Sequence, residues 1–479
     1  MKEGAGASAA GPKSKLILFS IILGTFMASL DSTIVAVALP TMAAEFSTSG
    51  STTDVSWILL GYTLALCCFI LLWGKMGTNY GYRKMFLTGT VIFTVMSFTI
   101  GLAGTMDLGG LNTIIVMRVV QGMGAGMITS MGLAMVSSYL PGSRGRAVGA
   151  ITLAASAGTA FGPVLGGLLC NFHWSYIFFI NVPIGILALL ISTYSMRGVT
   201  EIRGEKQRLD IVGVLLMVIM MFTLIYYLNS ANDNGWFSEI SLALIVTAFV
   251  MAGLLIWWEQ RTEEPLISVR LMSIRDVVGT NLVSLLLFMA MAGSYLLLPY
   301  YLELVLGYST LEMGLILVAN SVGMMLVGPT VGKISDKTGI NSGMVSIGCL
   351  ISAAGFLMMN RFGADTGLPF IIVALLLMGM GMGIGLVAST NLSMRYADPG
   401  EEGQLSSIIN TFRQAGSSAG VAILESVFAA GIVLPLVIPD GLVHAFRPAF
   451  FVACLFCLAA FVVSRFTKDK EYRESSSSE

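Results

Sequence analysis

Apolar stretches of about twenty residues alternate with short polar segments along nearly the whole chain. A helix of about 20 apolar residues is long enough to cross the hydrocarbon core of a bilayer. These stretches are apolar on every face, whereas a membrane β-strand would alternate apolar and polar positions. The pattern predicts an all-α polytopic membrane protein with fourteen transmembrane helices. The predicted spans are 15–38, 55–73, 85–104, 111–138, 147–170, 176–196, 211–228, 239–258, 277–302, 311–331, 343–359, 367–394, 404–434 and 447–464.

Basic residues are unevenly distributed between the loops of this topology. With the N-terminus in the cytoplasm, all but four of the 26 lysines and arginines fall in cytoplasmic segments. Such an excess is typical of the cytoplasmic loops of membrane proteins. We therefore expect a multi-pass protein of the cell membrane with both termini in the cytoplasm. A disordered leader is expected at residues 1–14 and a solvated tail at 466–479.

Glycine patterns recur in the two parts of the chain. Gly74 and Gly81 return as Gly332 and Gly339, and further glycines return at the same or nearly the same offset. The offset covers eight predicted helices, an even number, so the two copies have parallel topology, as in transporters that rock around a central site. We expect two six-helix halves in parallel repeat with two central helices inserted between them. These units are the N-terminal half, the insert and the C-terminal half, at residues 15–196, 197–275 and 276–465.

Composition and charge remove several classes of function. The chain is 56% hydrophobic and only 11% charged, and its net charge of -1 gives no reason to expect a nucleic-acid partner. Only two histidines occur, and the cysteine pair Cys454 and Cys457 lies inside an apolar run, so neither a metal nor another cofactor is expected. No phosphate-binding glycine loop or catalytic cluster is found in the sequence. An ion gradient, rather than a nucleotide, is the expected driving force, and an enzyme is not expected.

Three motifs resemble those of the major facilitator superfamily, in its fourteen-helix drug/proton antiporter branch. Leu30–Pro40 resembles the first-helix signature L-D-x-T-I-V-N-V-A-L-P, with Ala36 in place of Asn, and Arg118–Gly126 matches R-x-x-Q-G-x-G-x-G. Gly158–Gly167 is similar to the antiporter motif of the fifth helix. The resemblance implies an exporter that works by alternating access. The antiporter-motif positions are Gly158, Gly162, Pro163, Gly166 and Gly167.

The cytoplasmic-loop motif of the same family, G-x-L-A-D-x-x-G-R-[RK], is present with one departure. In the first copy Thr78 replaces the expected Asp, whereas the second copy keeps it as Asp336. In the family this Asp helps to close the cytoplasmic side, so any closure in the first half is expected to rest on Arg83, Lys84 and backbone dipoles. The loop-motif residues are Gly74, Gly81, Arg83, Lys84 and Asp336.

Four ionisable residues lie inside predicted spans, namely Asp31, Arg118, Arg413 and Glu425. Each costs about 2.5–3.5 kcal/mol at the bilayer centre on insertion scales, so each needs a partner, water or a function. We expect Asp31 to pair with Arg118, and movement of Arg118 or arrival of a substrate to switch a proton on Asp31. Asp31, Glu425 and Arg118 are the expected proton-coupling residues. The alternative for Glu425 is a lone acid reaching toward the outer surface.

Polar, aromatic and methionine side chains within spans are candidates for lining a substrate cavity. A flexible thioether suits an adaptable apolar cavity, although packing and interface anchoring explain the same residues. The candidates are Trp57, Tyr62, Gln121, Asn320, Met324, Asn410, Arg413 and Gln414.

The sequence as a whole predicts a monomeric secondary exporter of lipophilic, cationic drugs or toxic compounds in exchange for protons. Its expected partners are the lipid bilayer, small amphipathic substrates and protons. Two alternatives remain open. One is a dedicated exporter of a single metabolite, tetracycline-like antibiotic or fatty acid with the same fold. The other is a membrane sensor or assembly protein that does not transport.

Overall fold

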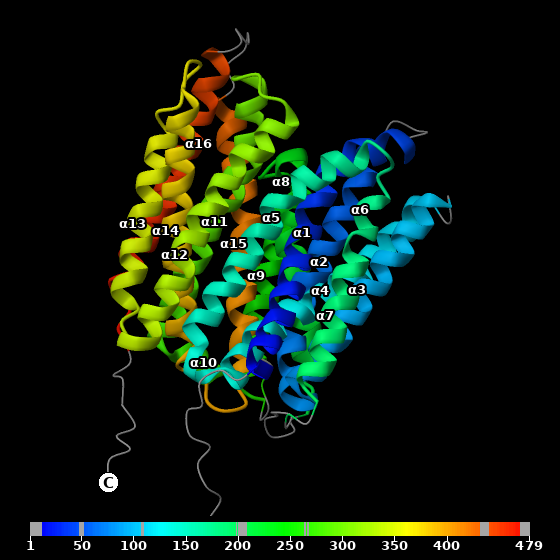
Figure 1. The fold of residues 1–479 in the computed structure, drawn as a ribbon, viewed down its shortest axis with the longest axis vertical. Helices are drawn as coiled ribbons and strands as arrows, with labels where there is room; N and C mark the ends of the chain where they lie inside the picture. Colours follow the sequence, from blue (N-terminus) through cyan, green and yellow to red (C-terminus); the bar gives the residue numbers. More distant parts are fainter. Residues whose placement is uncertain are drawn as a thin grey trace, which may run out of the picture.

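The computed structural model describes residues 12–46, 52–106, 110–197, 199, 208–262, 265, 268–431 and 440–469. This part of the chain is almost entirely helical (Figure 1). Thirteen of its helices are long and apolar enough to cross a membrane, which confirms the all-α polytopic prediction. The expected leader lies mostly outside the described residues, although α1 already begins at Pro12. The expected tail is described only as far as Asp469.

The first six spans form one group of helices. Two short helices in sequence, α6 and α7, make up the sixth predicted span. The elements are α1 (Pro12–Phe46), α2 (Thr52–Tyr80), α3 (Tyr82–Thr105), α4 (Gly110–Tyr139), the 3₁₀ turn η1 (Pro141–Ser143), α5 (Arg144–Cys170), α6 (Tyr176–Phe179) and α7 (Asn181–Ser195).

The second group and the helices between the two groups complete the described chain. The intervening elements are α8 (Ile211–Asn234), α9 (Glu239–Glu259) and the short α10 (Val269–Ser273). The second group consists of α11 (Arg275–Leu304), α12 (Thr310–Thr338), α13 (Ser342–Met359), α14 (Leu368–Met394), α15 (Glu402–Gly431) and α16 (Asp440–Ser464).

Helix α15 is the predicted span that is absent from the thirteen apolar helices. Its N-terminal half carries Gln404, Ser406, Ser407 and Asn410, so its apolarity is low for a helix that faces lipid. The side chains of Gln404, Ser406 and Ser407 are buried. The polar residues are accommodated because α15 packs against α2, α4, α8, α11 and α16, in the interior of the bundle.

The two groups meet through two helix pairs that occupy equivalent positions in the repeat. Helix α5 packs on α12, and α15 packs on α2 and α4. Glycines allow close approach at both contacts: a Cβ on Gly149 would lie 2.5 Å from the carbonyl oxygen of Gly328, and one on Gly403 would lie 2.7 Å from that of Gly74. Small residues of this kind let membrane helices approach backbone to backbone.

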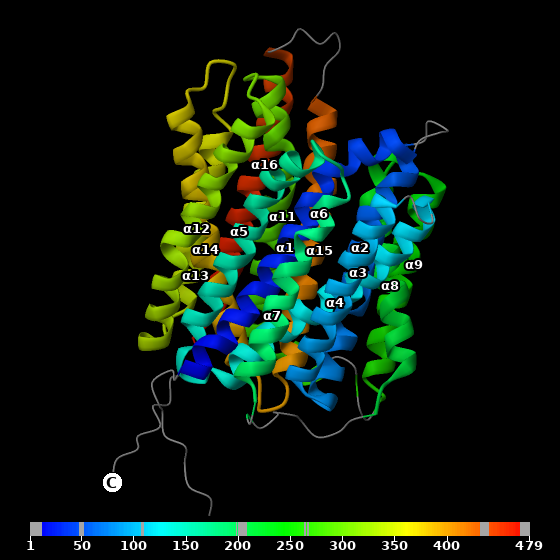
Figure 2. The ribbon, with the colours of Figure 1, turned by 45° about the vertical axis from the view of Figure 1, so that its right-hand side comes forward.

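The inserted hairpin α8–α9 lies at the edge of the bundle, as Figure 2 shows in green. Only 17% of the most apolar window of α9 is buried, against 78% in α4. Helix α8 contacts both α2 and α15. The Tyr226 ring stacks on Trp57 of α2 with centroids 5.7 Å apart, and Trp236 Nε1 donates to Ser426 Oγ of α15 at 2.7 Å. The hairpin therefore covers the seam where α2 and α15 meet.

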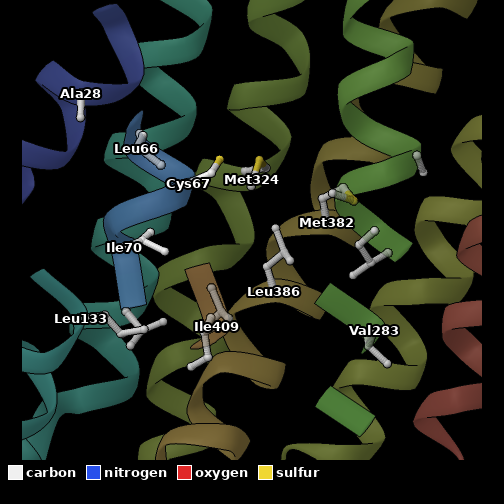
Figure 3. Close-up of a cluster of buried hydrophobic side chains, with 14 of the residues drawn as sticks. Ala28, Leu66, Cys67, Ile70, Leu133, Val283, Met324, Met382, Leu386 and Ile409 are labelled. Atoms are coloured by element: carbon white, nitrogen blue, oxygen red, sulfur yellow. The ribbon is translucent and has the colours of Figure 1, made fainter. Parts of the chain in front are cut away.

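Apolar side chains from both groups fill the space between them (Figure 3). Leu66 and Cys67 of α2 lie in one buried cluster with Met324 of α12 and with Met382 and Leu386 of α14. The centre of the bundle is thus a packed, methionine-containing core in this conformation.

Candidate functional site

Asp31 is the centre of a buried polar network in the first group of helices. Its side chain is fully buried, and its Oδ2 lies 2.6 Å from Arg118 Nη1 of α4. Its Oδ1 accepts from Asn181 Nδ2 of α7 at 2.9 Å and from Gln121 Nε2 of α4 at 3.2 Å. Two helices, α4 and α7, thus hold the carboxylate of α1 through charge-assisted hydrogen bonds, which are stronger than neutral ones.

Arg118 has further partners that fix its position. Its Nε donates to the Ile58 carbonyl oxygen of α2 at 3.1 Å, and its Nη1 also donates to Gln121 Oε1 at 2.7 Å. The guanidinium carbon lies 4.2 Å from the centroid of the Tyr62 ring. Gln121 Nε2 reaches Ser97 Oγ of α3 at 2.7 Å. The network therefore links five helices of one half.

The network retains unused hydrogen-bonding capacity. Among the described residues, Arg118 Nη2, the Tyr62 hydroxyl and Asn181 Oδ1 are buried without a hydrogen-bond partner. Buried polar atoms are normally satisfied, so three orphan atoms around one ion pair leave room for a second arrangement. Proton uptake by Asp31 is one event that would require such a rearrangement.

Asn181 and Ser97 were not among the residues expected from the sequence. Asn181 is a polar residue inside the apolar run 176–196, and this position alone could have marked it as a candidate. Ser97 gave no signal, because a serine in a membrane helix usually bonds to its own backbone.

The glycines of the antiporter motif press α5 against the part of α1 that carries Asp31. A Cβ on Gly158 would lie 2.5 Å from the Phe26 carbonyl oxygen, and one on Gly166 would lie 3.1 Å from that of Ile34. Gly162 faces Thr33 with no space for a side chain. Pro163 lies within the helix, and both Pro163 and Gly167 are partly buried. The motif therefore sets the position of the Asp31-bearing turn.

The predicted residues of α15 lie in the other half and contact different partners. Asn410 Nδ2 donates to the Ser406 carbonyl oxygen at 2.9 Å and weakly to that of Thr129 at 3.3 Å. Gln414 Nε2 points at Cys67 Sγ of α2, 3.8 Å away. Glu425 is partly buried near the far end of α15, next to the Ser426 that contacts Trp236.

Arg413 lies on α15 between Asn410 and Gln414 and is partly buried. Its Nη2 donates to Thr390 Oγ1 of α14 at 2.5 Å, and its guanidinium carbon is 5.7 Å from the centroid of the Phe288 ring of α11.

The remaining predicted cavity residues lie at helix contacts. Trp57 stacks on the inserted hairpin, as described above. Asn320 is buried and donates to the Tyr295 hydroxyl. Met324 accepts a hydrogen bond from Ser156 Oγ of α5 at 2.8 Å. In this conformation these side chains therefore join helices.

At one end of the bundle, Asp336 joins α12 to the start of α5. Its Oδ1 accepts from the Gly145 backbone N–H at 2.6 Å, and its Oδ2 accepts from that of Arg146 at 3.1 Å. Arg146 Nε lies 3.6 Å from the same carboxylate. An anion at a helix N-terminus is favourable because free N–H groups and the helix dipole meet it there. We call this contact the Asp336 latch.

The equivalent contact in the first copy of the motif is made by Tyr82. Gly403 occupies the position of Gly145 in the repeat, and its backbone N–H donates to the Tyr82 hydroxyl at 3.2 Å. The same hydroxyl lies 3.1 Å from the Gly400 carbonyl oxygen and from Glu402 Oε2. We call this contact the Tyr82 latch.

The expectation that Arg83 and Lys84 would close the first half stays a prediction, because Arg83 makes a different contact in this structure. Arg83 Nη1 donates to the Met196 carbonyl oxygen at 2.9 Å, within its own half, and Lys84 is exposed. Gly81, with φ of 102°, turns the chain between α2 and α3 and brings Tyr82 toward α15. Thr78 instead bonds to the Gly74 carbonyl oxygen of its own helix at 3.3 Å.

Two groups of helices, glycine-lined contacts between them and ionisable groups within the spans are features of membrane transporters. The family model for the Major Facilitator Superfamily matches residues 21–421 and 282–479. The chain belongs to the major facilitator superfamily, and the resemblance drawn from the motifs is confirmed.

Several characterised relatives cover most of the chain. It is 32% identical to the tetracenomycin C resistance and export protein of Streptomyces glaucescens, over 87% of this chain and 76% of that protein. It is 31% identical to the multidrug resistance protein Stp of Mycobacterium tuberculosis, with the same coverage. With the multidrug export protein EmrB of Escherichia coli the identity is 28%, over 87% and 81% of the two chains.

Solved structures show the same fold. The human organic anion transporter MFSD10 superposes with a TM-score of 0.66 at 16% identity, covering 95% of this chain and all of that one. The proton:xylose symporter XylE gives 0.65 at 14% identity, covering 95% and 96%. The protein is therefore a multi-pass membrane transporter of small molecules and not an enzyme.

Proposed function

We propose that this protein exports lipophilic drugs or other toxic compounds across the cell membrane in exchange for protons. The names of the relatives support export, since three of them are described as drug or antibiotic resistance or export proteins. The observation that carries the coupling is the fully buried Asp31, bound by Arg118 and by two amide groups. A proton, unlike a sodium ion, needs only one carboxylate.

In the proposed cycle, protonation of Asp31 removes the charge that holds Arg118 Nη1. Arg118 cannot lose its own proton, so it would keep the Ile58 carbonyl and the Gln121 amide oxygen and shift toward them. Because α1, α4 and α7 share the network, this shift would change how these helices pack. Substrate release toward the outside would then follow from rocking of the two halves. The two latches would lie on the cytoplasmic side, together with both termini, in a monomeric carrier.

Glu425 is proposed as a second proton-responsive carboxylate, on the C-terminal half. A cationic substrate would depend on this residue, because the charge of Asp31 is already matched by Arg118. One proton crossing 100 mV releases about 2.3 kcal/mol. That free energy sustains roughly a fiftyfold gradient of a neutral solute.

Proton-driven transport in liposomes tests this function. Purified protein is reconstituted, an inward-acid or inward-alkaline gradient is imposed, and movement of a fluorescent lipophilic dye is followed together with intravesicular pH. Asp31→Asn and Glu425→Gln are expected to lose transport against a gradient while still binding the dye. Glu312→Gln is the matched control, since Glu312 also carries a charge but only caps α12 through Ser309. Normal pumping by both of the first two variants would refute the assignment.

A dedicated exporter of one compound is a second candidate within the same fold. One relative, from Clostridioides difficile, is named a riboflavin transporter and is 28% identical over 87% of this chain. Competition between chemically unrelated dyes in the same liposomes separates the two: a multidrug carrier shows mutual inhibition, and a dedicated one does not.

A further inference from the structure

Arg413 is an intramembrane cation whose charge is not matched by any described carboxylate. It lies well inside α15, about 16 Å of helical rise from Glu402, where that helix begins. Among the described residues no Asp or Glu oxygen lies within the 4.0 Å of an ion pair with it, whereas Arg118 lies 2.6 Å from Asp31. Glu425 is on the same helix but about 18 Å further along.

The hydrogen bonds of Arg413 are also incomplete. Nη2 donates to the Thr390 hydroxyl, which in turn donates to the Leu386 carbonyl oxygen at 2.6 Å. Nε is buried and has no hydrogen-bond partner in the described part of the chain. The guanidinium, with five N–H donors in a planar fork, therefore keeps donors available on its Nε edge.

The repeat indicates that the fold does not require this charge. The position equivalent to Arg413 in the first half is Ala155 of α5, which packs in the same architecture. An unmatched cation within a membrane span is unfavourable, and such residues normally mark a path for an ion or a substrate. Arg413 is partly exposed as a residue, but its Nε is buried, so a ligand would reach this donor once the packing around it opens.

The surroundings of Arg413 define the kind of ligand. The Phe288 ring lies 5.7 Å from the guanidinium carbon, and the Gln414 amide nitrogen beside it lies 3.8 Å from the Cys67 thiol. Arginine binds planar oxyanions through two parallel hydrogen bonds. A flat aromatic skeleton that carries one carboxylate matches both the cationic fork and the aromatic face.

We propose that Arg413 recognises the acidic group of an exported lipophilic acid. The proposal rests on the proposed export function and specifies part of its substrate range. The sequence led us to expect cationic substrates, whereas this proposal predicts anionic ones. The reason is that Asp31 is already paired with Arg118, while Arg413 has no carboxylate partner among the described residues.

Binding of 2-naphthoate and of its neutral isostere 2-naphthamide tests the proposal. Calorimetry on the full-length protein in nanodiscs of neutral phosphatidylcholine gives affinities without any proton gradient. We expect 2-naphthoate to bind on the order of tenfold to a hundredfold more tightly than the amide, as for one charge-assisted contact. Arg413→Gln, which can keep a bond to Thr390, should abolish the difference, and Arg413→Lys should retain part of it.

A matched control removes a positive charge elsewhere. Arg361→Gln, at an exposed position beyond α13, should leave the preference unchanged. Equal affinities for acid and amide in the parent protein, or an equal loss in Arg361→Gln, would overturn the proposal.

A lipid phosphate could also bind to Arg413. The calorimetry is therefore repeated in nanodiscs that contain added phosphatidylglycerol. An unchanged affinity for 2-naphthoate in these nanodiscs supports a site for solutes. A lower affinity, caused by competition from the anionic lipid and absent in Arg413→Gln, would overturn the proposal in favour of a lipid site. Transport separates this proposal from the function itself. If a neutral dye is pumped but the naphthoate preference is absent, only the role of Arg413 fails; if nothing is pumped, the export function fails.

Discussion

The stability of the Asp31–Arg118 pair can be predicted quantitatively, because the second half of the chain shows the same helix packing without the two charges. The positions equivalent to these residues are Met289 and Leu376, so the same helix packing exists there without charges. Replacing one member of a buried pair leaves an unmatched charge and costs about 3–5 kcal/mol, whereas replacing both by apolar residues is often neutral. Asp31→Asn, Arg118→Leu and the double variant Asp31→Met with Arg118→Leu therefore form an informative series.

The structure refines these magnitudes. In Asp31→Asn, Arg118 keeps the Ile58 carbonyl oxygen and Gln121 Oε1 as acceptors, so we expect a loss of about 3 kcal/mol, at the lower end of the range. In Arg118→Leu, Asp31 keeps two amide donors and can become neutral by taking up a proton. The unmatched Arg118 of Asp31→Asn cannot become neutral, because arginine does not lose its proton in proteins. We therefore expect that variant to be no less stable than Asp31→Asn, apart from the packing of the new side chain.

Unfolding in mixed micelles of dodecyl maltoside and sodium dodecyl sulfate measures the series. Five of the six cysteines are buried, so a thiol-reactive fluorescent dye reports unfolding directly. The double variant should be more stable than either single variant and should not transport against a proton gradient. The reasoning is refuted if the double variant loses the sum of the two single losses, because independent sites behave additively.

Three further changes test contacts between helices. Asp336→Asn weakens two charge-assisted bonds from backbone N–H groups, and Tyr82→Phe removes a hydroxyl that contacts Gly403, Gly400 and the Glu402 carboxylate. Because a bond to a charged group contributes about 1.5–3 kcal/mol, each change should open the end of the bundle that carries the latches. Labelling of cysteines introduced at the two helix contacts measures the opening, and labelling unchanged from the parent protein would contradict the role of that latch. Gly158→Ala places a Cβ 2.5 Å from a carbonyl oxygen of α1 and should lower the free energy of unfolding by about 1–3 kcal/mol. Unfolding in mixed micelles measures this loss, and an unchanged midpoint of the unfolding transition would count against close packing at this motif. Trp236→Phe removes the hydrogen bond to Ser426 and should raise the reactivity of cysteines introduced at the ends of α2 and α15 that the hairpin covers. Trp257→Phe, at an exposed residue of α9, is the control, and identical labelling of both variants would exclude a covering role for the hairpin.

The spans and the central ion pair could be predicted because each depends on a property of a single helix. Continuous apolarity sets where a helix crosses the membrane, and the depth of Asp31 and Arg118 in neighbouring spans limits their choice of partner. Helix α15 shows that crossing the bundle and being apolar are separate properties of a helix. It was predicted from its position between polar segments, but its own polar residues are compatible with a membrane only because other helices bury them.

Partners that come from distant helices were harder to predict. Asn181 bonds to Asp31 and Ser97 bonds to Gln121 only because α7 and α3 pack beside α1 and α4, and no local pattern encodes that arrangement. The Tyr82 latch was missed for the same reason. The substitution at Thr78 was visible in the motif, but the replacement donor and acceptor lies on the next helix, beyond the turn made by Gly81.

The two halves of the repeat have diverged in the way they use charge, and this divergence suits a coupled carrier. A proton-responsive group must be able to change its charge without exposing it to lipid, and Asp31 meets that requirement because its cation and amide partners lie within the same half. A substrate-recognising group must instead have donors free in at least one conformation, and the proposed role of Arg413 fits that requirement because its Nε has no hydrogen-bond partner among the described residues. If both functions used one site, substrate and proton would compete for it directly. Because Asp31 and Arg413 lie on opposite halves, coupling between these two residues would pass through contacts that the halves share, among them the α5–α12 pair and the packing of α15 on α2 and α4. The Asp336 latch joins α12 to α5, and the Tyr82 latch joins α3 to α15, the helix that carries Arg413. Opening of the Tyr82 latch would therefore release the helix that is proposed to recognise the substrate.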